Sequence, residues 1–353
     1  MQLISALQNM PDAVRSVEPP DDLTFVDGDT PGIIRIRANR RKAEFIYRYA
    51  VSGLEVTEDD QARIKGLGIP PAWRDVWICP EPNGYLQATG IDEAGRKQYR
   101  YHPAWRAFRE RTKFSALTEF GALLPRIRRR VRQVFRENSE ADCELVTAAL
   151  VRLLDDAPLR IGSQTHAQDA LGASTLKKRN VRISKGVLHL DYTAKGGKRV
   201  RRQIKDRRLL SVLQSIDDLP GKTLFRYIGA DGDVHQLRSE HVNSWLQDVT
   251  CSAHITAKTF RTWAGSLAAF ERAVNDKNLT IKAMSEAASQ KLRNTPAVAR
   301  SSYIHPSIVD MKNKGFEERQ KLFATVTQSA SDLTRLETAM LMFLARAEGI
   351  EVI

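Results

Sequence analysis

The stretch NVRISKGVLHLDYTAKGGKRVRRQI, residues 180–204, indicates the fold most directly. Two turn signals, Lys185-Gly186 and the KGGK at 195–198, divide it into three short segments that contain many β-branched residues. Short runs of this composition between glycine-containing turns are typical of strands, and such tight connections join antiparallel neighbours. The stretch therefore predicts a three-stranded antiparallel meander with Lys195 at a hairpin tip.

Helical patterns surround this meander. Apolar residues recur at three-to-four spacing through 104–137, residues 143–157 form a second such pattern, and the chain from about 207 to 347 is again mainly helical. We therefore predict a large, mainly α-helical domain at residues 104–353 that carries the small sheet.

The N-terminal part has a different pattern. IIRIR at 33–37 alternates apolar and charged residues, and the run at 42–49 is rich in residues that favour strands. DVWICPEPNGYLQATGI at 75–91 predicts a hairpin closed at Asn83-Gly84, and RKQYRYH at 96–102 follows it.

These patterns divide the chain into three parts. Residues 1–28 contain three prolines and are expected to form a partly extended arm, and residues 29–103 form a β-rich domain before the helical domain at 104–353. The predicted fold class is α+β: a β-rich N-terminal domain plus a larger, mainly α-helical domain with a small three-stranded antiparallel sheet.

The charge balance indicates an anionic partner. The 353 residues carry a formal net charge of +13, and the pI is about 9.7. Nucleic acid is the commonest partner of such a chain, because Lys and Arg neutralise phosphates and release counterions. A basic protein without a nucleic-acid partner is the alternative.

Three basic runs favour nucleic acid over that alternative. Thirteen Lys and Arg residues lie between 177 and 208 against two acidic residues, and IRRRVRQ at 127–133 is a second run. In the third run the residues that could contact phosphates or base edges are Arg96, Lys97, Gln98, Tyr99 and Tyr101. A single run is usually a solvated face, but three runs in one chain favour nucleic-acid binding.

The cysteines and the chain's hydropathy suggest where the protein works. Cys79, Cys143 and Cys251 are far apart and odd in number, so we expect no disulfide framework and a reducing compartment. The sequence opens without a secretory signal pattern, and no apolar run reaches the ~18 residues of a membrane span. We expect a cytoplasmic, nucleoid-associated protein with no membrane partner.

Motifs for nucleotide or metal chemistry are incomplete. Gly221-Lys222-Thr223 ends like a phosphate-binding loop, but the position of its first glycine is Ile216. No CxxC or HExxH pair suggests zinc. Acidic pairs such as Asp155-Asp156 and Asp217-Asp218 are usually helix caps or solvated faces, which disfavours a two-metal nuclease site. We therefore expect no cofactor and no metal.

Five residues at distinctive local positions suggest phosphoryl transfer. They are Arg160 beside a break at Pro158 and Gly162, Lys195 at the hairpin tip, Arg261 on one helix face with Lys258, Asn294 before the helix start Thr295-Pro296, and Tyr303 near the end of that helix. A tyrosine can attack a phosphodiester and form a bond of similar energy, so the strand can be resealed without ATP. Guanidinium groups stabilise the charge of the transition state, and a lysine can protonate the leaving 5′-oxygen.

A family resemblance supports this hypothesis. The tract GIPPAWRDVWICPEPNGYLQATGIDEAGRKQYRYHPAWR at 68–106 closely resembles the N-terminal signature of type IB DNA topoisomerases of the small bacterial, poxvirus-like form. LRIGS, TAKGGK, KTFRTWAG and LRNTPAVARSSYIHP follow in family order, so the resemblance covers roughly residues 30–310. It implies a fold shared with tyrosine recombinases and an isomerase that relaxes supercoiled duplex DNA. Cleavage of one strand through a 3′-phosphotyrosyl intermediate, strand rotation and religation would need neither ATP nor metal, and a monomer would clamp the DNA.

The resemblance also implies catalytic roles. Tyr303 matches the nucleophile, and Arg160 and Arg261 match two arginines that bind the scissile phosphate. Lys195 matches the hairpin lysine that protonates the leaving 5′-oxygen, with Arg160 assisting. Asn294 matches a position that is histidine in poxvirus enzymes, and as asparagine it can donate a hydrogen bond to phosphate but cannot titrate.

Further positions match residues that contact DNA, and one position departs from the family pattern. Lys258 matches a DNA-contacting lysine, and Gln98, Tyr99 and Tyr101 match contacts made by the β-rich domain. Arg293 stands where the family often has glycine, which leaves the shape of this turn open.

Two alternatives to this family remain. A tyrosine site-specific recombinase would use the same catalytic groups, but recombinases usually have His-x-x-Arg where this chain has Lys258-Thr-Phe-Arg261, and their N-terminal domain is usually helical. A non-catalytic, basic DNA-binding protein would show salt-sensitive binding without a covalent adduct. The complete set of five groups disfavours this second alternative.

Overall fold

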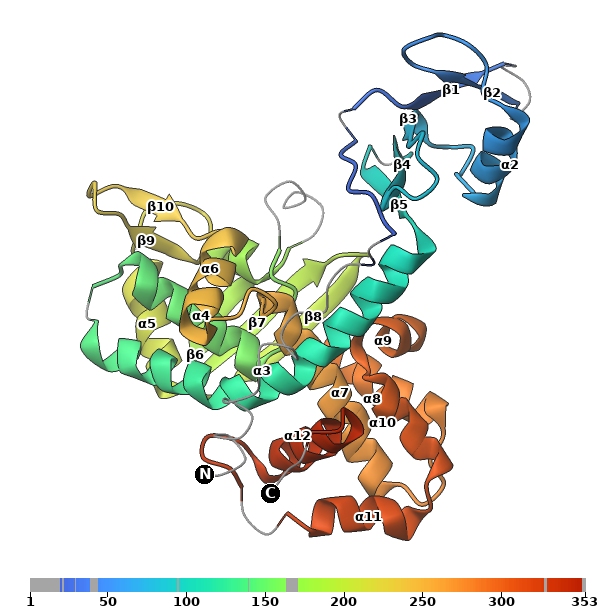
Figure 1. The fold of residues 1–353 in the computed structure, drawn as a ribbon. Helices are drawn as coiled ribbons and strands as arrows, with labels where there is room; N and C mark the ends of the chain where they lie inside the picture. The colour runs from blue at the N-terminus through green and yellow to red at the C-terminus, as the bar shows by residue number, and fades with distance from the viewer. Residues whose placement is uncertain are drawn as a thin grey trace. The chain divides into compact units, whose positions relative to one another are not determined.

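The computed structural model describes most of the chain, and Figure 1 draws its elements. The described residues are 20, 22–28, 30–38, 44–93, 95–138, 140–162, 171–326 and 329–350, without the side chains of 109–113 and 115. They form two compact units, one within residues 20–113 and one within 114–350, here called the β unit and the helical unit. Most of the predicted arm lies outside the described residues, and the domain boundary at 103–104 remains a prediction.

The β unit is built on one antiparallel sheet. Its strands are β1 (Ile33–Arg37), β2 (Phe45–Tyr49), β3 (Arg74–Ile78), β4 (Leu86–Ile91) and β5 (Lys97–Tyr101), in the order β2-β1-β3-β4-β5. Helix α2 (Glu58–Gly66) packs its buried Ile64 with strand residues that include Ile33 and Ile78. The predicted β-rich character of this region is confirmed.

The predicted hairpin is confirmed as the β3–β4 pair, but Asn83-Gly84 does not form a two-residue turn. Ile78 pairs with Ala88, so a longer loop joins the strands. The segment at 79–82 contains two prolines, which cannot donate hydrogen bonds to a ladder. Gln87 closes the loop instead, because its Nε2 donates to the carbonyl oxygen of Gly84 at 2.7 Å.

The helical unit contains most of the helices. They are α3 (Pro103–Glu137), which spans the boundary between the units, α4 (Cys143–Asp156), α5 (Arg207–Asp217), α6 (Ser239–Thr250), α7 (Ala257–Asn275), α8 (Ile281–Leu292), α9 (Pro296–Tyr303), α10 (Pro306–Asp310), α11 (Phe316–Ala324) and α12 (Arg335–Ala347). Helix α4 packs against α5, α6 and α7. Its apolar residues from Leu145 to Leu154 are almost all buried, because a helix that is apolar on every side must be surrounded.

The meander predicted from residues 180–204 is confirmed. It consists of β6 (Val181–Ser184), β7 (Val187–Ala194) and β8 (Lys198–Ile204), in that order and antiparallel. Ala194 pairs with Lys198, which leaves Lys195 in the turn. A second, unpredicted antiparallel pair, β9 (Arg226–Ile228) and β10 (Val234–Gln236), is too short to produce a recognisable alternation.

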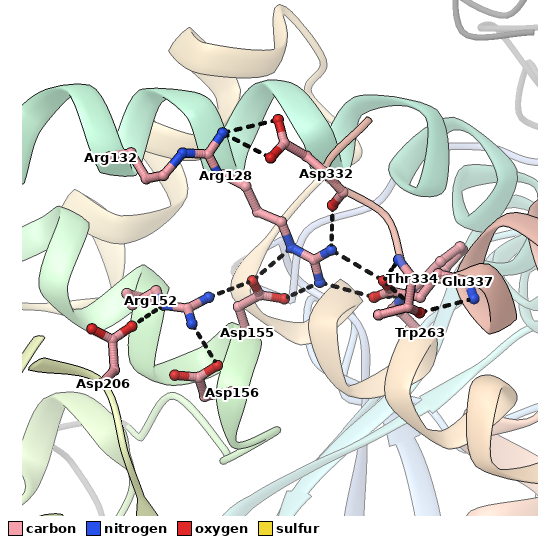
Figure 2. A network of polar contacts seen from close by, with 10 residues as sticks. All are labelled: Arg128, Arg132, Arg152, Asp155, Asp156, Asp206, Trp263, Asp332, Thr334 and Glu337. Carbon is pink, nitrogen blue, oxygen red and sulfur yellow. Dashed lines mark hydrogen bonds and ion pairs between the residues drawn. The ribbon is translucent and has the colours of Figure 1, made fainter. Parts of the chain in front are cut away.

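The acidic pair Asp155-Asp156 is not the cap or solvated face expected from the sequence. Asp155 lies 2.8 Å from Arg128 and 3.2 Å from Arg152, and Asp156 lies 2.9 Å from Arg152. These charges form part of a polar network between helices (Figure 2). No helix among the described residues is long and apolar enough to cross a membrane.

Candidate active site

Arg261 is a buried cation whose partners are carbonyl groups. It lies in α7, and 4% of the residue is exposed. Its guanidinium donates to the carbonyl oxygen of Pro158, after α4, and at 3.2 Å to that of Leu292, at the end of α8. Burial lowers the pKa of Arg261, because the charge is desolvated without a carboxylate partner among the described residues. This arrangement favours binding of an anion.

Tyr303 is held beside Arg261 by contacts with α7, the helix in which Arg261 lies. It is the last residue of α9, it is 6% exposed, and its ring centroid lies 5.0 Å from Arg261 Cζ. Ser266 Oγ, in α7, donates to the carbonyl oxygen of Tyr303 at 3.2 Å. A Cβ at Gly265 would lie 2.7 Å from that oxygen, so glycine is needed where α7 meets α9. Helix α7 therefore positions both groups.

The surroundings of Tyr303 favour its ionised form. Burial by itself would raise the pKa of Tyr303. The charge of Arg261 and a hydrogen bond from its guanidinium, followed by the charges of Arg160 and Lys258, outweigh burial and hold the pKa below its usual value. Tyr192 faces Arg261 and Arg160 as well, but burial raises its pKa to about 12. Of these two tyrosines, Tyr303 is therefore the one that ionises more readily.

Arg160 follows α4 in a segment whose backbone is fixed by a neighbouring turn. Its carbonyl oxygen accepts a hydrogen bond from Ala173 N at 2.7 Å, and Ser174 donates through both N and Oγ to Ile161 at 2.8 Å. The side chain of Arg160 is half-buried, and its charge acts on Tyr303. The structure thus brings Arg160 together with Arg261 and Tyr303.

Asn294 carries a buried amide group with no hydrogen-bond partner among the described residues. Both its Oδ1 and its Nδ2 are buried and unpaired. Leaving such groups unpaired costs about 1–3 kcal/mol each, so they favour a polar ligand. Thr295 then caps α9 by accepting a hydrogen bond from Val298 N at 3.3 Å, with Pro296 as the first helical residue. This confirms the predicted helix start.

The turn before Asn294 has a backbone conformation that suits glycine, although Arg293 occupies it. Helix α8 ends at Arg293 in the left-handed conformation, with φ of 54°. Glycine adopts this conformation without strain, whereas a residue with a Cβ does not. The turn therefore keeps the shape that glycine would favour. Burial, and after it the positive charge of the exposed Arg293, lowers the pKa of Arg202.

The two predicted lysines are exposed. Lys195 lies at the tip of the β7–β8 hairpin, in the turn between the paired residues Ala194 and Lys198. Lys258 lies in the first turn of α7, one helical turn before Arg261, and its charge contributes to the lowered pKa of Tyr303. Of the five catalytic candidates, the structure brings Arg160, Arg261 and Tyr303 together and places Asn294 two residues after Leu292, which Arg261 binds.

Known families match both units. Residues 102–331 match the family described as eukaryotic DNA topoisomerase I, catalytic core, and residues 44–92 match the N-terminal domain of bacterial DNA topoisomerase IB. This chain belongs to the type IB DNA topoisomerases. DNA topoisomerase 1B of Acanthamoeba polyphaga mimivirus is 30% identical over 280 residues, which cover 74% of this chain and 82% of the viral protein.

The family membership decides between the hypotheses drawn from the sequence. The chain is a type IB DNA topoisomerase, an isomerase that relaxes DNA, as the sequence motifs predicted. The recombinase alternative loses its support, because the N-terminal unit is a five-stranded sheet of the bacterial topoisomerase type rather than a helical domain.

The topoisomerase carries five of its six predicted DNA-contacting residues on edge strand β5 and the turn before it, and the sixth, Lys258, lies in α7. Lys97, Tyr99 and Tyr101 are exposed, and the two tyrosine rings stack with centroids 6.1 Å apart. Arg96 and Gln98 are less free, because their side chains donate to Asp92 at 2.9 and 2.8 Å. Lys97, Tyr99 and Tyr101 therefore present exposed polar or aromatic groups on this strand.

Other surface residues of the topoisomerase were missed by the sequence reasoning. Phe25 is 79% exposed and stacks on Tyr85 at 4.8 Å, which extends the aromatic surface of β5. The second basic run lines a groove of about 920 Å³ between α3 and α6, and this groove also contains Arg126, Arg136 and the half-buried Trp245. Only the helical spacing of 126, 129, 130, 133 and 136 could have revealed this wider face.

Proposed function

We propose that Tyr303 is the nucleophile of this topoisomerase. Its phenolate oxygen attacks a phosphodiester of duplex DNA, a bond forms between phosphorus and the tyrosine oxygen, and the bond to the 5′-oxygen breaks. The 3′-end is then held as a phosphotyrosyl diester while the free 5′-hydroxyl end rotates. Attack by that hydroxyl restores the strand and releases Tyr303, so torsional strain drives the reaction without ATP.

Arg160 and Arg261 would bind the non-bridging oxygens of the scissile phosphate. Their positive charge is desolvated in the site, where it stabilises the more negative transition state more strongly than it would in water. Asn294 would donate its unpaired amide hydrogens to the same phosphate. Lys195, at the exposed hairpin tip, would give a proton to the leaving 5′-oxygen, and Lys258 would contact DNA beside the site.

The substrate contacts of the β unit are part of this proposal. Lys97, Tyr99 and Tyr101 would contact the duplex from β5, and Arg96 and Gln98 would exchange Asp92 for DNA groups. We further propose a monomer that clamps the DNA and works in the cytoplasm on the nucleoid.

The observation that carries the proposal is the contact between Tyr303 and Arg261, with the ring 5.0 Å from the guanidinium carbon. It joins a nucleophile with a lowered pKa to a buried cation that has no carboxylate partner among the described residues. A phosphodiester supplies both the electrophile and the missing negative charge.

Relaxation of supercoiled plasmid in EDTA without ATP tests the proposal. The wild type and Tyr192→Phe should relax the plasmid, because Tyr192 is the neighbouring tyrosine with the raised pKa. Tyr303→Phe should bind DNA without relaxing it or forming a covalent adduct. Relaxation by Tyr303→Phe together with a covalent adduct would show that another residue is the nucleophile.

A further inference from the structure

Helix α12 begins with a buried carboxylate that joins three helices. Glu337, in its first turn, is 4% exposed. Its Oε1 accepts from Arg128 of α3 at 2.8 Å and from Trp263 Nε1 of α7 at 3.4 Å, and its Oε2 accepts from Thr334 N at 2.8 Å (Figure 2). The side chain of Glu337 thus connects α12 to α3 and to α7, where its partner Trp263 lies two residues after Arg261.

Arg128 passes this connection to the end of α4. Its Nε and one terminal nitrogen donate to the two carboxylate oxygens of Asp155 at 2.8 and 2.9 Å, while the terminal nitrogens also reach Glu337 and the carbonyl oxygen of Asp332 (Figure 2). The planar guanidinium therefore binds both carboxylates at once, which a lysine ammonium could not do in the same fixed geometry.

The end of α4 leads directly to the active site. Asp155 is in the last turn of α4, Pro158 follows three residues later, and Arg160 follows two residues after that. The carbonyl oxygen of Pro158 accepts the hydrogen bond from Arg261. A shift at Asp155 would therefore move one catalytic arginine and a hydrogen-bond partner of the other.

Close packing makes this connection stiff. A Cβ at Gly121 of α3 would lie 2.5 Å from the Trp263 ring and 2.9 Å from Leu341 of α12, so the three helices meet there without spare room.

Beyond the other end of α12, Glu348 Oε1 lies 3.9 Å from Nε2 of His305, two residues after Tyr303. His305 is neutral at pH 7, because burial lowers its pKa to about 4, so this is a polar contact and not an ion pair.

We propose that α12 positions the active site, and that Glu337 and Arg128 are positioning residues that hold the segments carrying Arg160 and Arg261 in register. This inference rests on the function proposed above for the two arginines. The residues that match the topoisomerase catalytic core end at 331, before α12 begins, so the family match assigns no role to this helix.

A buried charge network is well suited to positioning. Its net contribution to stability is small, because desolvation of the ions offsets much of their attraction, whereas its geometry is strict. A misplacement of about 1 Å at a reacting centre can slow a reaction by about a hundredfold. Removal of one partner also leaves the other charges buried and unpaired, which strongly destabilises the fold, so the variants must be compared well below their melting points.

The test compares single-turnover cleavage at saturating DNA in Arg128→Met, Glu337→Gln and the control Arg272→Met. Arg272 lies near the end of α7, pairs with Asp276 at 2.8 Å on the surface, and has no ion pair with Asp155 or Glu337 among the described residues. We expect Arg128→Met and Glu337→Gln to cleave at least about tenfold more slowly at a temperature well below their melting points, with DNA affinity within about twofold of wild type. Arg128→Lys should lie between wild type and Arg128→Met, and Arg272→Met should match wild type.

The pH profile separates positioning from a general loss of structure. Arg261, Arg160 and Lys258 are the charged groups that lower the pKa of Tyr303. If the arginines move away from Tyr303 in Arg128→Met, cleavage should require a higher pH than in the wild type. Wild-type rates in both Arg128→Met and Glu337→Gln, or an equal loss in Arg272→Met, would overturn the inference. Should Arg128→Met fail to fold, Glu337→Gln alone decides, because it keeps the size and the acceptor oxygen of the side chain.

The proposed function fails in a different way from this inference. If Tyr303 is not the nucleophile, Tyr303→Phe still forms the covalent adduct, whatever the variants of Arg128 do. If only the inference is wrong, Tyr303→Phe is inactive while Arg128→Met and Glu337→Gln keep the wild-type rate and pH profile.

Discussion

Half-buried Arg128 and buried Arg261, both in the helical unit, differ in what surrounds them. Arg128 lies between the carboxylates of Asp155 and Glu337, and these partners raise its pKa despite burial. Arg261 binds carbonyl groups and an aromatic ring, and burial lowers its pKa. The first environment satisfies its cation within the protein, whereas the second leaves a charge to be satisfied by a ligand. The difference separates a structural charge from one that is available to the substrate.

Removing Arg261, the cation that is available to the substrate, should have the largest effect on the cleavage rate. Arg261→Ala should slow single-turnover cleavage by about 10³-fold, because a preorganised donor to the transition state is lost. Its loss also raises the pKa of Tyr303, so the remaining activity should increase toward high pH. The control is Arg272→Ala on the same helix, where Arg272 pairs with Asp276 at the surface. Equal losses in the two variants would contradict the distinction drawn here.

Replacing the exposed Lys195 should slow cleavage by a large factor that depends on the leaving group. Lys195→Ala should slow cleavage of an ordinary phosphodiester by about 10²-fold, because the 5′-oxygen leaves without a proton. A substrate with a 5′-bridging sulfur should lose much less, since a thiolate leaves without help. Lys185→Ala, at the other turn of the same sheet, is the matched control. A similar loss on both substrates would exclude general-acid catalysis by Lys195.

Asn294, a neutral hydrogen-bond donor, should contribute less to the cleavage rate than the buried cation Arg261. Asn294→Ala should slow cleavage by about tenfold, because a neutral hydrogen bond stabilises the transition state less than a charged fork does. The variant should be at least as stable as wild type in the absence of DNA, since it removes an amide with no partner among the described residues. A larger loss than in Arg261→Ala would reverse this ranking.

Asp156, at the edge of the Arg128 network, should lower the free energy of unfolding at neutral pH. Burial raises the pKa of Asp156 to about 6, so the folded protein holds this proton more tightly than the unfolded chain does. Its ionisation therefore opposes folding, by an amount that grows from about pH 4 to about pH 6 and is complete above that. Asp156→Asn should stabilise the protein by about 1 kcal/mol at pH 8 and by less at pH 4.5.

Thermal unfolding at the two pH values, with the exposed Asp218→Asn as control, measures this effect. A stability gain that is equal at both pH values would show that the ionisation of Asp156 is not its cause.

The smallest expected effect is at the turn that leads to Asn294. Arg293→Gly should raise the unfolding free energy by about 0.5–1 kcal/mol, because the left-handed conformation strains arginine and not glycine. The cleavage rate should change by less than about threefold, since Arg293 is exposed and the backbone keeps its path. A loss as large as that of Asn294→Ala would show that Arg293 itself binds the DNA phosphate.

The local elements could be predicted from the sequence because their signals are local. The meander at 180–204 and the α9 start at Thr295-Pro296 are both set by turn and cap residues within a few positions. The prolines at 79–82 misled the hairpin prediction, because they lengthened a turn that Asn83-Gly84 suggested would be short.

The candidate site could be named from motifs, but its geometry could not. The sequence motifs and the family resemblance identified Arg160, Arg261 and Tyr303, and their proximity appears only when α7, α9 and the segment after α4 pack together. Ser266 and Gly265, which dock the end of α9, carried no signal of their own, since small residues are common in helices.

The sequence by itself determined most strands and helices of both units, the family and the set of catalytic candidates, because capping, alternation and motifs act over short distances. Only the tertiary structure decided which arginine is paired and which is available, since Arg128 and Glu337 are 209 residues apart in the chain. Whether a buried charge serves structure or substrate depends on the groups that folding brings to it, and no local pattern contains that information.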